Sequence, residues 1–156
     1  MTSSRPAHRL LLLWALLAAP LARAGLGEPQ SSIETEGQHL HARHATAQAP
    51  QYTLHVLTMA DGSRVQQYVG ADGRVMAVRW NTLYKPDLSQ LLGSSFPAYA
   101  TAAHAAAQKG GIQRHFHHEG NDLVLHSSGH LHVFTGYAYR RSLLPRGLRA
   151  QDLGLG

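Results

Sequence analysis

The sequence predicts a single α+β domain, in which helices lie against one face of an antiparallel sheet of about six strands. Two groups of β-type runs lie at 52–80 and from 114 onward, and helical patterns lie between them. Tight-turn sequences separate the runs within each group. Strands that are segregated from helices in this way are typical of α+β domains. We therefore expect a helical segment inserted between two three-stranded meanders.

Residues 1–24 are predicted to be a signal peptide that is cleaved after Ala24. A basic segment with Arg5 and Arg9 precedes an apolar run at 10–19, and Ala-Arg-Ala at 22–24 matches a cleavage site. The apolar run is shorter than the about 20 residues of a spanning helix, which disfavours an uncleaved anchor. The sequence thus predicts a periplasmic or secreted protein without a stable membrane anchor.

The chain has 14 basic and 9 acidic residues, for a formal net charge of +5. Three of its arginines lie in the predicted signal peptide, so the remaining excess of basic residues is small. No basic run is long enough to form an electrostatic stripe, which argues against a nucleic-acid partner. Cysteine is absent, which excludes disulfides and thiol catalysis.

A leader is predicted over 25–51, followed by the α+β domain at 52–150 and a C-terminal tail at 151–156. Ser-Ser-Ile-Glu at 31–34 matches a capping box and predicts a short helix over about 31–43. The composition of 45–51, Ala-Thr-Ala-Gln-Ala-Pro-Gln, predicts a linker.

The first meander is predicted from three runs rich in Val, Thr, Tyr and Trp, at 52–59, 63–69 and 74–80. Ala-Asp-Gly separates them at 60–62 and again at 71–73. Asp-Gly favours the positive backbone angles of tight hairpin turns, so consecutive runs should pair antiparallel.

Two helices are predicted next. Pro86 suits the first turn of one helix, Asp87 lies near its positive end, and Gly93 ends it. Ser94-Ser95 can cap a second, alanine-rich helix that ends at Gly110-Gly111.

The second meander is predicted to have two tight turns, whose registers should keep apolar residues on one buried face. A three-residue loop at 127–129 pairs Leu125 with Leu131, and a two-residue loop at 120–121 pairs Phe116 with Leu125.

These registers place five histidines on the opposite face of the sheet and His118 on the buried side. The five are His115, His117, His126, His130 and His132. Neighbouring imidazoles on one face can supply the nitrogen ligands of zinc or copper. The simpler interpretation is a solvated sheet face on which histidine is the polar residue. The other histidines, His39, His41, His44, His55 and His104, are interpreted as surface or packing residues.

No nucleophile elbow, phosphate loop, dinucleotide fingerprint or zinc-protease motif is present. Ser127 and Ser128 lie beside histidines, but serine is common in turns for conformational reasons. We therefore assign no catalytic or cofactor-binding residue and expect a protein that is not an enzyme.

The stretches YVGADGRVMAVRW, PDLSQLLGSSFPAY, DLVLHSSGH and FTGYAY resemble the secreted proteobacterial proteins of domain-of-unknown-function family 2844. The resemblance covers nearly all of the chain after the signal peptide. Its most specific positions are Gly73, Val75, Ala77, Trp80, Pro86, Asp87, Leu88, Leu91, Leu92, Gly93 and Phe96. It implies a small exported protein, and most of the five histidines lie outside the shared pattern.

The leading hypothesis is an exported binding domain whose partner is a periplasmic protein or a small ligand. Binding would use the sheet face or the connection between Trp80 and Pro86. The alternative is a periplasmic zinc-binding or copper-binding protein that uses the five histidines.

Overall fold

The computed structural model describes residues 25–108 and 114–156. The predicted signal peptide and the predicted helix end at Gly110-Gly111 lie outside the described residues. Among the residues described, no helix is long and apolar enough to cross a membrane.

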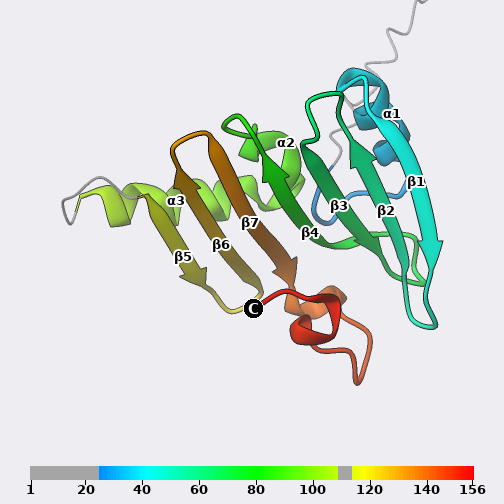
Figure 1. Ribbon diagram of the computed structural model, residues 1–156. Coiled ribbons are helices and arrows are strands. Elements are labelled where there is room, and N and C mark those ends of the chain that lie inside the picture. The colour runs from blue at the N-terminus through cyan, green and yellow to red at the C-terminus, as the bar shows by residue number, and fades with distance from the viewer. Residues whose placement is uncertain (1–24, 109–113) are drawn as a thin grey trace, which may run out of the picture.

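In the described part of the chain, a seven-stranded sheet forms the centre of the molecule, with all neighbouring strands antiparallel (Figure 1). The strand order is β1-β2-β3-β4-β7-β6-β5. The strands are β1 Arg43–Gln48, β2 Thr53–Thr58, β3 Arg64–Val69, β4 Val75–Thr82, β5 His115–Glu119, β6 Leu123–His130 and β7 Val133–Arg140. The α-helices are α1 Ser31–His39, α2 Leu88–Leu92 and α3 Phe96–Ala107, and the 3-10 helices are η1 Gly93–Ser95, η2 Arg141–Leu143 and η3 Ala150–Leu153.

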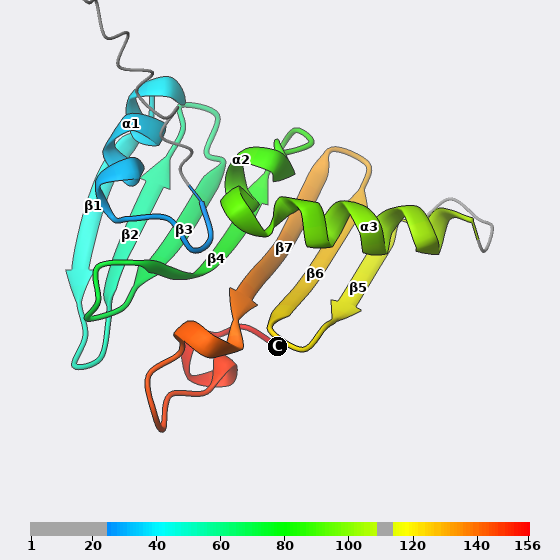
Figure 2. The same cartoon turned by 180° about the vertical axis from the view of Figure 1, so that it is seen from behind.

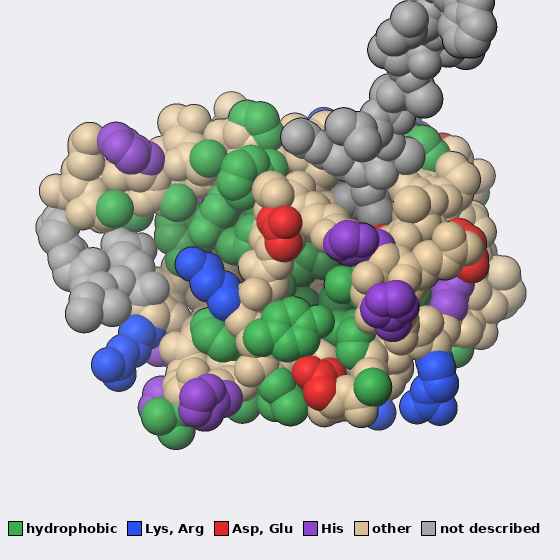
Figure 3. Space-filling view, turned by 90° about the horizontal axis from the view of Figure 1, so that it is seen from above, with side chains coloured by type: hydrophobic (Ala, Val, Ile, Leu, Met, Phe, Trp, Pro, Cys, Tyr) green, Lys and Arg blue, Asp and Glu red, His purple; other side chains and the backbone are tan. Residues whose placement is uncertain are grey.

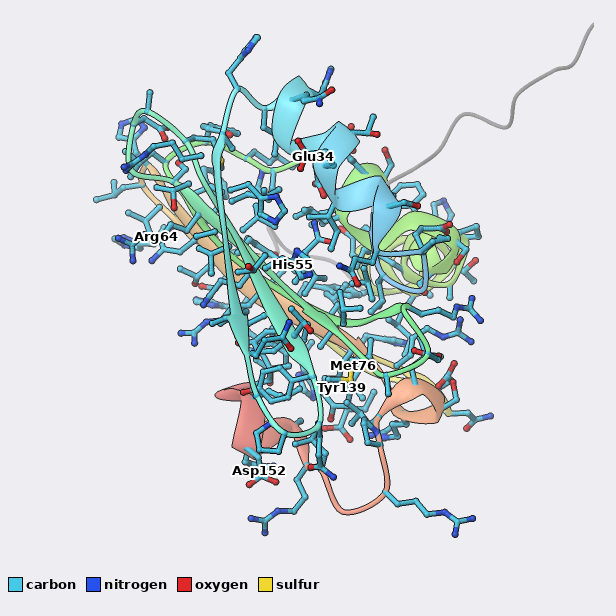
Figure 4. All side chains as sticks on the ribbon, turned by 90° about the vertical axis from the view of Figure 1, so that its right-hand side faces the viewer. Glu34, His55, Arg64, Met76, Tyr139 and Asp152 are labelled. Carbon is cyan, nitrogen blue, oxygen red and sulfur yellow. The ribbon has the colours of Figure 1, made fainter. Side chains whose placement is uncertain are left out.

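The predicted α+β class is confirmed, because α2 and α3 lie between β4 and β5 in the chain and cover the sheet. The three helices lie on one face of the sheet, and the C-terminal segment packs against the other face (Figures 2 and 4). The core on the helical side includes Leu26, Ile33, Leu57 and Trp80. The predicted leader therefore begins inside the core, since Leu26 is fully buried.

The extra strand is β1, in the segment that composition predicts as a linker. Arg43–Gln48 pairs along its whole length with β2, although all six of its residues are exposed. Backbone pairing holds this edge strand without apolar alternation, so its sequence carries no strand signal. Helix α1 also ends earlier than predicted, at His39, because His41 adopts a left-handed φ of 49°.

Both predicted turns of the second meander are wrong. Strand β6 continues through 127–129 and turns at 131–132, so Leu125 pairs with Ala138. Leu131 is not a core residue but is 83% exposed at the turn. In the neighbouring strand pair, Trp80 of β4 lies across Gly136 of β7, where an added Cβ would come within 2.2 Å of the Trp80 ring.

The β5–β6 turn is longer than predicted, and Phe116 pairs with Ser127 rather than with Leu125. The register differs by two residues, which leaves every β5 side chain on its predicted face. His118 accordingly pairs with Leu125 and lies on the helical side, as predicted.

Candidate functional site

The predicted histidine face brings together two of its five members. His117 and His126 oppose each other directly on β5 and β6, with ring centroids 5.9 Å apart. His115 pairs with Ser128, His130 lies at the far end of β6, and His132 lies in the turn beyond it. Within 25–108 and 114–156, no three His, Cys, Asp or Glu side chains are grouped so that they could hold a metal ion.

The neighbours of the two histidines form a row of rings on the exposed face of the sheet. His126 stacks on Tyr137 with a centroid distance of 5.6 Å, and Tyr137 stacks on Tyr139 at 6.5 Å. His117 Nε2 lies 3.4 Å from Glu119 Oε1, and Arg141 lies 3.5 Å from the other oxygen of Glu119. The rings on this face contact one another, and the Glu119 carboxylate pairs with His117 and Arg141.

A pocket of about 260 Å³ lies at the opposite half of the sheet, between α1, α2 and the connection from β4 to α2. It is lined by Glu36, His39, Leu40, Met59, Val65, Thr82, Tyr84, Lys85, Pro86, Asp87, Gln90 and Leu91. Hydrophobic, acidic and histidine side chains occur side by side on this end of the molecule (Figure 3). The Trp80–Pro86 connection, expected to bind a partner, thus forms one wall of the pocket.

Local hydrogen bonds fix that wall. Thr82 Oγ1 donates to the carbonyl of Tyr84 at 2.7 Å, and the amide of Leu83 donates to Ser63 Oγ at 3.0 Å. Asp87 is the N-cap of α2, where its Oδ1 accepts from the amide of Ser89 at 2.8 Å. The connection is therefore held by its own side chains and presents a preformed surface.

Helix α1 supplies the buried wall of the pocket. Ile33, Glu36 and Gly37 point at the sheet because residues three and four apart share a helix face. Gly37 lets the helix approach Leu57 of β2, since an added Cβ would lie 3.2 Å from a methyl group of Leu57. This close approach buries the carboxyl group of Glu36.

Glu36 is only 2% exposed, and its Oε2 accepts a hydrogen bond from Gln67 Nε2 of β3. Burial raises the pKa of Glu36 from 4.5 to about 7, although the Gln67 hydrogen bond opposes this rise. No ion pair to Glu36 occurs among the described residues. The carboxyl group is therefore poised to exchange a proton near neutral pH.

Three buried polar atoms in this region have no hydrogen-bond partner among the described residues: Glu36 Oε1, Gln67 Oε1 and His55 Nε2. His55 and Gln67 are directly opposed on β2 and β3, under α1. Buried polar groups are nearly always paired, so unpaired ones in one region mark a site that can accept hydrogen bonds from a bound molecule.

His55 also belongs to a chain of contacts that reaches the surface. Its Nδ1 lies 2.9 Å from His44 Nε2, and His44 Nδ1 lies 3.2 Å from Glu34 Oε2. Glu34 on α1 and His55 on β2 lie on facing elements (Figure 4). Burial, and then the charge of His44, lower the pKa of His55. His44 is a surface residue and His55 a packing residue, in line with the sequence interpretation, but the contact between their rings was not predicted.

Sequence reasoning did not select Glu36, although one signal was present. Glu36 lies three residues after Ile33, on the apolar face of the predicted helix, where a carboxylate is unusual. Gln67 carried no such signal, because its burial depends on which helix covers β3.

No curated protein and no solved structure matches the chain. A family model described as "Protein of unknown function (DUF2844)" matches residues 22–153. Its range includes every residue of the pocket and of the histidine face. Because the match spans most of the sequence, the chain belongs to this family of proteins of unknown function.

Proposed function

We propose that this protein is an exported binding domain that holds a small ligand in the pocket between α1 and the β4–α2 connection. The observation that carries the proposal is Glu36, a buried carboxyl group that lines the pocket and has one oxygen without a partner among the described residues. Ligand sites are typically apolar clefts with a few polar groups that fix orientation. Leu40, Met59 and Leu91 supply such an apolar lining here.

Export is supported by the basic, apolar and small-residue segments of residues 1–24. A periplasmic or secreted binding domain would meet small molecules outside the cytoplasm and would need no cofactor of its own.

A fragment screen followed by amide NMR shifts tests this function. Ligands should shift the amides of α1 and of residues 82–91 while leaving those of β5 and β6 unchanged. Replacement of His39, which lines the pocket, by tryptophan should block the shifts. Its neighbour Gln38 is exposed and does not line the pocket, so Q38W is a matched control. Shifts confined to the exposed sheet face would contradict the proposal.

The alternative function, zinc or copper binding at the histidine face, rests on the direct opposition of His117 and His126. Titration of the purified protein with each metal separates the two functions. Stoichiometric binding tighter than micromolar that is lost in H126A would support the alternative, whereas weak binding that is unchanged in H126A would contradict it.

A further inference from the structure

Two of the three unpaired atoms, the oxygens of Glu36 and Gln67, are hydrogen-bond acceptors. Gln67 uses its Nε2 as the donor to Glu36 Oε2, so the remaining Gln67 oxygen can only accept. Ionised Glu36 can also only accept, through Oε1. Both oxygens are buried and without a donor among the described residues. A molecule that complements them must bring hydrogen-bond donors.

The negative charge of ionised Glu36 limits which donor group of a ligand would bind best. A buried carboxylate is costly unless a cation pairs with it, and no ion pair reaches Glu36 in the described residues. An ammonium group carries up to three donors and a positive charge, whereas a hydroxyl group brings one donor and no charge. Charge-assisted hydrogen bonds of this kind are also about twice as strong as neutral ones.

Resting on the proposed binding function, we propose that the ligand of this pocket is a small primary amine whose ammonium group binds Glu36. Glu36 Oε1 is shielded from water, so binding of the ammonium requires the Glu36 side chain to turn towards the pocket that it lines. Gln67 then holds the second carboxylate oxygen in place. The apolar body of the amine packs against Leu40, Met59 and Val65.

The mouth of the pocket does not oppose this assignment. His39, Lys85 and Asp87 line it and are all exposed, so solvent screens their charges. The volume of about 260 Å³ is at the small end for ligand sites, which fits an amine with a short apolar chain.

Three probes of equal chain length test the ligand class: hexylamine, 1-hexanol and hexanoate, each titrated into the purified protein and followed by amide NMR. At pH 8 hexylamine is cationic and Glu36 is largely ionised. We expect hexylamine to bind at least about tenfold more tightly than hexanol, and hexanoate to bind least. The preference for hexylamine should shrink at pH 5.5, where Glu36 holds a proton.

The matched pair E36Q and E34Q locates the effect. Both substitutions lie on α1 and remove one carboxylate, but Glu34 does not line the pocket. E36Q should abolish the preference for hexylamine over hexanol, and E34Q should keep it. The comparison of probes on the unsubstituted protein does not depend on how either variant folds.

The outcomes separate the ligand class from the binding function. Equal binding of hexylamine and hexanol at the pocket amides overturns the amine assignment and leaves the binding function standing. A preference for hexylamine that persists in E36Q also overturns the role of Glu36. If no probe shifts the pocket amides and the fragment screen is also silent, both the ligand class and the binding function fail.

Discussion

Glu36 is a carboxyl group on the sheet-facing side of a helix, with its charge neither exposed to water nor paired with a cation among the described residues. It is buried because it lies on the helix face, with Ile33 and Gly37, that packs against the sheet. Its pKa of about 7 follows from that burial. The packing of α1 thus places a proton-exchanging group beside the pocket.

The raised pKa of Glu36 predicts how stability depends on pH. The folded protein holds the Glu36 proton to higher pH than the unfolded chain does. The protonated group therefore contributes fully to the free energy of unfolding below about pH 4.5, and this contribution is lost as the pH rises through about 7. The loss is at most roughly 3 to 4 kcal/mol, from about 1.4 kcal/mol for each pKa unit. Urea unfolding at several pH values should show that the free energy of unfolding of E36Q rises relative to that of the unsubstituted protein between pH 5 and pH 8. A constant difference across this range would contradict the prediction.

Strand β1 is held by its pairing with β2 and by side chains that contribute little apolar burial. All six of its residues are exposed, and its ring contact is that of His44 with His55, at a centroid distance of 5.1 Å. His44 also contacts Glu34 of α1. The His44 ring thus joins α1, β1 and β2. Such an edge strand should open more readily than the central strands.

Removing the His44 ring should loosen β1 without unfolding the sheet. In H44Q the His55 and Glu34 contacts are lost, and β1 amides should exchange about 30-fold faster, from about 1 kcal/mol for each of the two contacts. H41N is a suitable control, because His41 lies in the preceding turn at positive φ, which Asn tolerates. Equal exchange in both variants would show that backbone pairing alone holds the strand.

The stability of the β1 pairing should depend on pH because of His55. Its pKa is lowered in the folded protein, so the unfolded state binds more protons and stability falls as pH drops through about 6.5. Hydrogen exchange, corrected for its intrinsic pH dependence, should therefore show β1 opening preferentially under mildly acidic conditions.

The whole molecule depends on the pairing of β4 with β7, which joins the two meanders into one sheet. Gly136 and Trp80 oppose each other at this junction, and the Trp80 ring lies where a Gly136 side chain would be. The core on the helical side is thereby continuous across the two halves.

A methyl group at Gly136 should weaken this junction. In G136A the new Cβ would lie 2.2 Å from the Trp80 ring and 2.4 Å from the carbonyl oxygen of His126, so either the ring or the backbone must move. We expect a loss of about 3 kcal/mol, the upper range for overpacked cores, measured by urea unfolding. In G129A the new Cβ would lie 3.0 Å from the edge of the Phe134 ring, so the loss of stability should be smaller than in G136A. A smaller loss in G136A than in G129A would contradict this packing.

The sequence alone determined the fold class, the first meander and the positions of the helices between the meanders. Those features depend on local chemistry, namely Asp-Gly turns, strand alternation and the Asp87 cap, which act within a few residues. Tertiary structure alone decided that 43–48 is a strand, that Leu131 is exposed and that Glu36, Gln67 and His55 lie together. Each of these depends on a neighbour in space: β2 pairs with β1, Ala138 rather than Leu131 lies opposite Leu125, and α1 covers Gln67 and His55. The sequence shows that one face of a segment is buried but not which distant element covers it, so the pocket could be located only in three dimensions.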